Sequence, residues 1–252
     1  MLVICYGIAK SGSTLAYELV RGVLMSAGHD QTRFRHAALK PRGRGNHMAS
    51  VERADLASLI DALGGRILAA KTHLCFADAD FAWMEEMQRA RKLQVVASYR
   101  DPRDMCLSLV DHGERSRKQG RNAFRRVRDL SAAAEVIGRG IHKFAKWSSL
   151  EGTLRLAFET AAFAPDDAIA AIETSLGVTG DPEQAKLHAF EDSFTQQNKR
   201  RKTRYDTELD AAENAQMLNV FGDFIRRVCE GRDEEWFGEV RRRLSAGGGV
   251  PA

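Results

Sequence analysis

Residues 7 to 14, Gly7-Ile-Ala-Lys-Ser-Gly-Ser-Thr14, lie between two different hydrophobic patterns. The apolar run 2–8 that leads into them is typical of a buried strand, and apolar residues recur at helical spacing after them, at Leu15, Leu19, Val20, Val23 and Leu24. A strand that passes through a glycine-containing turn into a helix presents backbone N–H groups and the positive helix end to an anion. The stretch therefore predicts a phosphate-binding loop with Lys10 as its cation.

The position of this lysine helps to distinguish between classes of phosphate-binding loop. In nucleotide triphosphatases the lysine follows the second glycine, as Gly-x4-Gly-Lys-Ser/Thr. Here Lys10 precedes Gly12, and Ser13 occupies the lysine position. The spacing therefore disfavours an ATPase or a GTPase. A strand-to-helix turn that binds no ligand is the alternative that this motif leaves open by itself.

A second polar cluster, Lys71-Thr72-His73, follows the run 66–70 (Arg-Ile-Leu-Ala-Ala), which predicts another buried strand. Ligands bind beyond the carboxyl ends of the strands in open α/β sheets, so we expect this cluster in such a crevice. Imidazole is matched to removing a hydroxyl proton at neutral pH, and nearby Lys10 and Lys71 should disfavour its protonation, which makes His73 a candidate base. A structural, hydrogen-bonded histidine is the alternative.

A third polar cluster follows the apolar run 93–98 and begins with Arg100. Asp101 suits the N-cap of a helix and Pro102 suits its first turn, so Ser108 is expected in the second or third turn. The planar guanidinium of Arg100 can donate two parallel hydrogen bonds to one phosphate. An ordinary capped helix with surface salt bridges would explain the charges without a ligand.

Together and in this order, the three clusters resemble the motifs of the sulfotransferases that use 3′-phosphoadenosine 5′-phosphosulfate (PAPS) as donor. The run 10–14 resembles the 5′-phosphosulfate loop of that family, the run 71–74 resembles its Lys-Thr-His-Leu segment, and the run 100–108 resembles its 3′-phosphate segment. The resemblance implies an α/β fold of three layers and P-loop type, with a mainly parallel central sheet flanked by helices. It also implies PAPS as the co-substrate.

The resemblance further implies a role for each residue of these motifs. His73 would be the general base, Lys10 would stabilise charge on the bridging oxygen, and Lys71 would help to neutralise the sulfuryl oxygens. The donor would be bound by Lys10, Ser11, Gly12, Ser13, Thr14, Arg100 and Ser108.

Weaker matches lie further along the chain. Phe158 stands where the family has an aromatic residue at a strand end, and Phe194 resembles its adenine contact. Arg201 and Lys202 resemble a later loop on the 3′-phosphate, whereas Leu15 replaces the tryptophan that packs on adenine in the family. The alternatives are a core aromatic residue at 158 and a solvated basic surface at 199–204.

The chain has 252 residues and no Pro/Gly/Ser-rich linker, so we expect one domain over 1–245 and a disordered tail over 246–252. The net charge is +4, with basic residues gathered in 33–44, 115–128 and 199–204. Such clusters favour an anionic ligand, and without an RNA-binding motif they do not indicate a nucleic-acid partner. The long segment 29–46, rich in Arg, Gly and His, is a candidate lid.

The four cysteines, Cys5, Cys75, Cys106 and Cys229, lack the spacing of a metal site and are expected to be reduced thiols. We expect no metal ligands elsewhere in the chain. With no charged leader and no apolar run of membrane-spanning length, the sequence favours a cytoplasmic enzyme without stable membrane insertion.

Apolar residues at helical spacing predict helices over 51–63, 81–91, 124–150, 182–194, 209–230 and 234–244. In the third of these a single stripe is expected to lie in the core rather than at an acceptor site. It comprises Phe124, Val127, Leu130, Ala134, Ile137, Ile141 and Phe144.

The function implied by the resemblance is transfer of a sulfuryl group from PAPS to a hydroxyl, or less readily to an amine. The acceptor would be a small molecule, glycan or lipid that the sequence does not identify. One rival is a P-loop kinase for a nucleotide or small molecule, which would use ATP and magnesium with Asp101 or Asp104 as the metal ligand. The other rival is a nucleotide-binding module without catalysis.

Overall fold

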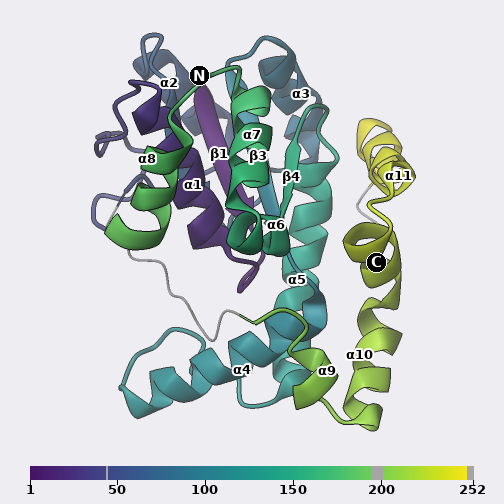
Figure 1. Cartoon of the computed structure of the whole chain (residues 1–252). Helices are drawn as coiled ribbons and strands as arrows, with labels where there is room; N and C mark the ends of the chain where they lie inside the picture. Colours follow the sequence, from purple (N-terminus) through teal and green to yellow (C-terminus); the bar gives the residue numbers. More distant parts are fainter. Residues whose placement is uncertain (44, 194–200, 249–252) are drawn as a thin grey trace.

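The computed structural model describes residues 1–43, 45–193 and 201–248, and its centre is a sheet of four parallel strands (Figure 1). These are β1 (Leu2–Gly7), β2 (Leu68–Thr72), β3 (Leu93–Tyr99) and β4 (Leu154–Ala157), in the order β2-β1-β3-β4. Leu2 of β1 pairs with Leu68 on one side and with Leu93 on the other. Because the strands run the same way, the residues that follow them emerge at one edge of the sheet.

Helices cover both faces of this sheet, so β1 is buried throughout. Its alternate residues point to opposite faces: Leu2, Ile4 and Tyr6 pack in one core, and Val3 and Cys5 pack in another. The first core takes residues from α2 (Arg53–Ala62), α3 (Phe81–Arg89), α5 (Leu130–Ser148), α10 (Ala211–Phe224) and α11 (Glu234–Ser245). The second takes residues from α1 (Ser13–Ser26), α7 (Pro165–Leu176) and α8 (Pro182–Leu187). These three layers confirm the fold class predicted from the sequence.

The remaining elements are short or lie beside the sheet. Long α4 (Pro102–Lys118) leaves the end of β3 and contacts α5 (Figure 1). As predicted, Asp101 caps α4, since its carboxylate accepts a hydrogen bond of 2.8 Å from Arg103 N. The shorter elements are η1 (Asp78–Asp80), α6 (Phe158–Phe163), the π-helical η2 (His188–Asp192), α9 (Tyr205–Glu208) and the π-helical η3 (Ile225–Glu230).

The helix predicted over 124–150 starts later than expected, at Leu130. Asp129 caps it by accepting a hydrogen bond of 2.8 Å from Ala132 N, and Phe124 has a positive φ of 57° that no helix accommodates. Ile137 and Phe144 of the predicted stripe lie in the core, but Phe124 lines a cavity. Phe124 also packs against this core, so the stripe belongs to the core as predicted, whereas the prediction that Phe124 lies in the same helix was wrong.

The segment 29–48 covers the free edge of β2. The side-chain amide of Gln31 makes the two hydrogen bonds that the backbone of a neighbouring strand would make at this edge. Its nitrogen donates to Ile67 O at 2.8 Å, and its oxygen accepts from Ala69 N at 2.9 Å. Further on, Met48 N donates to Lys71 O, and Lys71 N donates to Asn46 O, each at 2.8 Å. The candidate lid is thus fastened at both ends, and the tip between them reaches the carboxyl edge of the sheet.

Of the predicted tail 246–252, the structure describes only 246–248, and the rest lies outside the described residues. Ala246 N donates to Arg242 O at 3.1 Å and Gly248 N donates to Arg243 O at 2.9 Å, so these residues close the end of α11. The four cysteines carry free thiols. Among the helices described, none combines the length and the apolar character needed to cross a membrane.

Candidate active site

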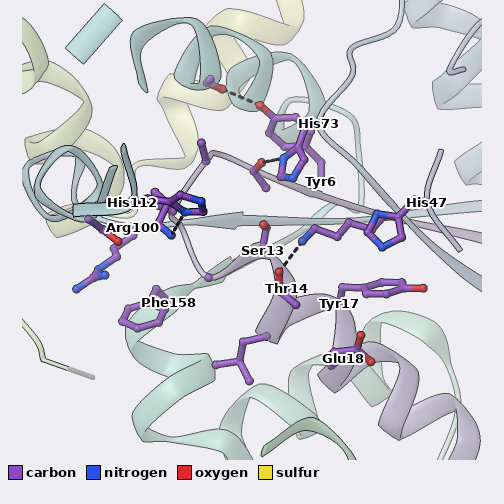
Figure 2. Close-up of a pocket in the computed structure, with 18 of the residues that line it drawn as sticks. Tyr6, Ser13, Thr14, Tyr17, Glu18, His47, His73, Arg100, His112 and Phe158 are labelled. Carbon is purple, nitrogen blue, oxygen red and sulfur yellow. Dashed lines mark hydrogen bonds between the residues drawn. The ribbon is translucent and has the colours of Figure 1, made fainter. Parts of the chain in front are cut away.

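The residues that follow β1, β2 and β3 meet in one cavity of about 740 Å³ (Figure 2). Lys10, His73 and Arg100 all line it, although they come from three different strand ends. Other residues singled out in the sequence line the same cavity, namely Gly12, Ser13, Thr14, Lys71, Ser108 and Phe158. A cavity of this size accommodates a ligand as large as a nucleotide.

Two glycines shape the loop between β1 and α1. A Cβ atom at Gly7 would lie 2.3 Å from Ser13 Cβ and 2.4 Å from Ser98 Oγ, so only glycine lets α1 begin this close to the sheet. Gly12 has a φ of 76°, and a Cβ atom there would lie 2.6 Å from Cδ2 of Phe158. Backbone conformation and space both require glycine at position 12.

The start of α1 leaves several backbone donors without partners in the helix. The first helical hydrogen bond runs from Ala16 N to Gly12 O at 3.0 Å, and no side chain caps this end. The N–H groups of Ser13, Thr14 and Leu15 therefore have no acceptor within the helix. Together with the helix dipole, they form the anion-binding end that the sequence predicts.

Ser11 differs from its neighbours in the loop. Its side chain is fully buried, with Oγ lying 3.0 Å from Ser98 Oγ, and its N–H donates to Ile8 O at 3.1 Å. Ser11 thus fastens the loop to β3 and lies behind the surface that lines the cavity. A direct contact of its hydroxyl with a ligand stays a prediction.

Lys10 reaches across the cavity to α4. Its backbone adopts a φ of 69°, a conformation that costs a non-glycine residue roughly 1 kcal/mol. Its Nζ atom lies 3.2 Å from Nδ1 of His112. Burial, with the positive charges of Arg115 and Arg100 opposing the effect of Asp111, lowers the pKa of Lys10 to about 8. A half-buried cation in a strained loop, with no carboxylate hydrogen-bonded to it among the described residues, is well suited to pair with an anionic ligand.

Lys71, at the end of β2, contacts the start of α1, because its Nζ atom donates to Thr14 Oγ1 at 2.7 Å. The side chain is buried, and burial lowers its pKa to about 8, with Lys10 contributing in the same direction and Cys5 and Glu18 opposing it. Since the Thr14 oxygen accepts from Lys71, its own proton remains available to an acceptor in the cavity. The second cluster is thereby linked directly to the first.

His73 is oriented by the first residue of the loop. Its Nδ1 atom lies 2.8 Å from Gly7 O, and a carbonyl oxygen only accepts, so Nδ1 carries the proton and Nε2 holds the lone pair. His73 is exposed and lines the cavity. Desolvation, followed by Lys71, His47 and Lys40, lowers the pKa of His73 to about 4, while the Gly7 hydrogen bond opposes the shift. The imidazole is therefore neutral at pH 7, as a general base must be.

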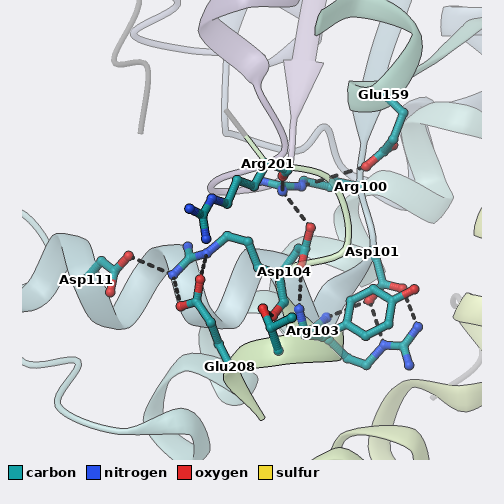
Figure 3. A network of polar contacts seen from close by, with 11 residues as sticks. Arg100, Asp101, Arg103, Asp104, Asp111, Glu159, Arg201 and Glu208 are labelled. Atoms are coloured by element: carbon teal, nitrogen blue, oxygen red, sulfur yellow. Dashed lines mark hydrogen bonds and ion pairs between the residues drawn. The ribbon is translucent and has the colours of Figure 1, made fainter. Parts of the chain in front are cut away.

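Arg100 is held in a buried network (Figure 3). Its Nη2 atom donates to Asp104 Oδ2 at 2.5 Å and to Arg201 O at 2.9 Å, and its guanidinium lies 4.2 Å from the ring centroid of Phe158. Its Nε atom is buried and makes no hydrogen bond within the described part of the chain; the nearest carboxylate oxygen, on Glu159, is 3.8 Å away. This unsatisfied donor is a place for an anionic oxygen.

The two carboxylates that a magnesium-dependent kinase would need are engaged elsewhere. Asp101 accepts hydrogen bonds from the backbone and guanidinium of Arg103, and Asp104 accepts from Arg100 and from Tyr205 N. Neither aspartate is among the residues that line the cavity. The part of the chain that the structure describes therefore gives the kinase alternative no carboxylate after β3 that faces the loop.

Ser108 and Phe158 lie on the Arg100 side of the cavity. Ser108 is 4% exposed and sits in α4, as predicted. Phe158 begins α6 directly after β4, with one face against Arg100 and its ring 6.0 Å from that of Phe163. Leu15, at the position of the family's tryptophan, also lines the cavity. Phe158 and Leu15 give this side of the cavity an apolar surface, as an adenine-binding wall would have.

The structure describes only part of the C-terminal segment in which ligand contacts were predicted. Phe194 lies outside the described residues, and Phe190 of η2 lines the cavity. Arg201 contributes its carbonyl oxygen to Arg100, and its side chain is exposed. Lys202 places Nζ 4.7 Å from the ring centroid of Phe163. The segment thus passes beside Arg100 and α6, whereas phosphate contacts from Arg201 and Lys202 stay predictions.

Several cavity residues were missed from the sequence. They are Tyr17 and Glu18 of α1, Lys40, Arg42 and His47 of the segment 29–48, His112 of α4, and Val136, Arg139, Gly140 and Lys143 of α5. The α5 residues follow a spacing of three and four, which the core stripe of the same helix obscured. The basic cluster 33–44 was the available indication of Lys40 and Arg42.

Comparison with known proteins supports the fold. No protein-family model matches the chain, and no curated protein matches its sequence. The chain is similar to the crystal structure of mouse sulfotransferase SULT7A1 complexed with PAP, with a TM-score of 0.56 and 14% sequence identity, over 92% of this chain and 86% of that one. At this identity the likeness shows a shared fold and nothing more.

Proposed function

We propose that this chain is a sulfotransferase that moves the sulfuryl group of PAPS to a hydroxyl, or less readily an amine, of an acceptor. The observation that carries the proposal is the meeting of Lys10, His73 and Arg100 in one cavity beside an uncapped helix start. Each strand end alone has an ordinary explanation, but an anion-binding loop, a neutral imidazole and a buried arginine with an unused donor are needed together for this reaction. The cytoplasmic location stays a prediction.

The groups in the cavity fit a nucleotide that is anionic at two ends. The uncapped N–H groups of α1 would hold the 5′-phosphate, with Lys10 and Thr14 beside them. The unsatisfied Nε of Arg100 and the hydroxyl of Ser108 would hold the 3′-phosphate. Phe158 and Leu15 would cover the adenine between them. This fit rests on a buried donor, Nε of Arg100, that makes no hydrogen bond among the described residues.

In the proposed reaction the acceptor oxygen forms a bond to sulfur as the bond between sulfur and the bridging oxygen breaks. Nε2 of His73 accepts the acceptor proton, since Nδ1 is committed to Gly7 O. The electron pair of the broken bond stays on the phosphate oxygen of the product PAP, where Lys10 stabilises the charge. Lys71 neutralises the sulfuryl oxygens and positions the hydroxyl of Thr14.

The proposal is tested by thermal stabilisation with 3′-phosphoadenosine 5′-phosphate (PAP), compared with ATP and magnesium. PAP at a hundredfold its Kd should stabilise the fold by about 2.7 kcal/mol. Adenosine 5′-phosphate, which lacks the 3′-phosphate, should stabilise it less. A preference for ATP with magnesium would overturn the assignment, and PAP binding without turnover on any acceptor would leave only a nucleotide-binding module.

A further inference from the structure

The part of the cavity around His73 is more cationic than the donor requires. Lys40 and Arg42 line it from the segment 29–48, and Arg139 and Lys143 line it from α5. The two α5 residues are four apart and so share one face of that helix. Counting Lys10, Lys71 and Arg100 as well, seven lysines and arginines line the cavity, against one carboxylate among the described residues, Glu18.

Neither this carboxylate nor other acidic side chains neutralise the four additional cations. Glu18 is engaged by Arg21 at 2.7 Å and by His188 at 3.0 Å. Arg139 has only Glu135 at 4.0 Å, and both side chains are largely exposed, so this pair contributes little. Within the described residues Lys40, Arg42 and Lys143 make no ion pair, so the charge is left for a ligand.

Two of these cations, Lys143 and Lys40, interact with the candidate base. Lys143 Nζ donates to His73 O at 3.4 Å, which places it at the residue that would take the acceptor proton. Lys40 lies near enough to act on the same imidazole electrostatically. Arg100 and Ser108, by contrast, follow β3 on the other side of the loop.

On this basis, and resting on the proposed function, we propose that the acceptor carries an anionic group besides the hydroxyl that is sulfated, and that Lys143 and Arg139 of α5, with Lys40 and Arg42, bind that group. Carboxylate, sulfate and phosphate share the required chemistry, since each offers oxygens to two cations at once. An uncharged phenol or steroid would leave these cations unpaired.

Such an acceptor would also assist the base. Lys71, His47 and Lys40 all lower the pKa of His73, and Lys143 adds a further positive charge at its carbonyl oxygen. An anion bound between these side chains offsets their charge and strengthens the imidazole as a base. Charge on the acceptor would therefore improve the chemical step as well as binding.

The experiment compares acceptors that differ only in charge, using the full chain with PAPS for rates and with PAP for binding by calorimetry. The pairs are 4-hydroxyphenylacetate with its amide, methyl glucuronide with its amide, and methyl glucoside 6-sulfate with methyl 6-deoxyglucoside, so that both members of a pair have the same free hydroxyl groups. The first two pairs test a carboxylate and the third tests a sulfate. We expect at least one anionic member to be preferred roughly tenfold or more over its neutral partner.

Two double variants locate the effect: Arg139→Gln with Lys143→Gln on α5, and Lys40→Gln with Arg42→Gln on the exposed tip of the segment 29–48. Each should reduce the ratio of anionic to neutral acceptor. The matched control is Arg89→Gln, because α3 ends at Arg89 shortly before β3 begins, at the opposite edge of the sheet from the cavity. This control removes a charge but should leave the ratio unchanged.

The inference is overturned if neutral members are accepted equally well, if no anionic member reacts or binds, or if both double variants keep the preference. A preference lost equally in the Arg89 variant would also overturn it, because it would reflect net charge alone. The proposed function is judged separately, by PAP binding and by sulfation of the neutral members. An enzyme that binds PAP and sulfates only neutral acceptors would retain the function and refute the anionic acceptor.

Discussion

Nδ1 of His73 donates a hydrogen bond of 2.8 Å to the carbonyl oxygen of Gly7, so the first residue of the anion-binding loop orients the candidate base that follows β2. The two residues are 66 positions apart in the chain. They meet because β1 and β2 are adjacent parallel strands, with Tyr6 paired to Thr72. The loop and the base therefore form one unit, and several consequences of this arrangement can be measured.

Replacing His73 should separate chemistry from donor binding. His73→Ala removes Nε2, and a positioned base typically contributes about 10²–10⁴-fold to the rate. We expect the rate of sulfation to fall by that order, while the Kd for PAP changes little. His36→Ala is the matched control, because His36 bonds to Ser58 and does not line the cavity. Full activity of the His73 variant would show that another group takes the proton.

Replacing Ser108 should affect only ligands with a 3′-phosphate. Ser108→Ala removes a hydroxyl from the cavity wall without leaving a bulky void, and loss of a hydrogen bond to a charged group costs about 1.5–3 kcal/mol. We expect PAP to bind at least about tenfold more weakly. The affinity for adenosine 5′-phosphate should stay the same.

A serine two turns further along α4 provides the control for this change. Ser116 is also buried, at 2% exposure, but is not among the residues lining the main cavity. Ser116→Ala should leave both affinities unaltered. An equal loss for both nucleotides in the Ser108 variant would place this hydroxyl away from the 3′-phosphate.

Donor binding should weaken as the pH rises through about 8. Lys10 and Lys71 each have a pKa of about 8 in the free protein, because burial lowers both values. The neighbouring groups that act on one or the other are Arg115, Asp111, Arg100, Cys5 and Glu18. Binding of an anion requires the charged forms of both lysines. PAP should therefore be taken up together with protons near pH 8.5. Calorimetry in two buffers of different ionisation enthalpy measures this uptake. Lys71→Met should reduce the number of protons taken up. If the wild type takes up no protons, the lowered pKa values of the two lysines are contradicted.

Stability should rise with pH between about 4 and 6.5 through His73. The pKa of His73 is about 4 in the fold against 6.5 for the free side chain, so the unfolded chain binds more protons in this window. The free energy of unfolding therefore decreases as the pH falls from about 6.5 to about 4. Urea unfolding of the wild type and His73→Gln at several pH values isolates this contribution. An identical pH dependence of both proteins would argue against a lowered pKa of His73 in the fold.

Gly12→Ala should destabilise the loop more than its backbone conformation alone requires. A positive φ costs an alanine about 1–2 kcal/mol, and the new methyl group would also clash with Phe158 at 2.6 Å. Gly28→Ala is the control, because Gly28 has a φ of 84° with nothing within 4 Å of the added atom. The double variant of Gly12→Ala with Phe158→Leu should recover part of the stability that Gly12→Ala loses beyond Gly28→Ala. If the changes in unfolding free energy of the two single substitutions simply add, the clash is excluded.

The sequence by itself determined the order of strand, loop and helix and the positions of Lys10, His73 and Arg100 at strand ends. Both follow from local rules: an apolar run too short for a helix forms a buried strand, and parallel strands bring their carboxyl ends to one edge. The start of α4 was also predictable, because a capping aspartate and a proline act within one turn. The start of α5 was not, since Phe124 fits an apolar stripe but adopts a positive φ.

Only the tertiary structure decided which further side chains share the cavity. Lys10 meets His112 across 102 positions, and Lys143 meets His73 across 70 positions. Such contacts depend on how α4, α5 and the segment 29–48 pack around the sheet. No periodic pattern within those segments predicts this packing. The cationic surroundings of the base arise in the same way, because a charged residue on an exposed helix face becomes part of a site only when another element closes over it.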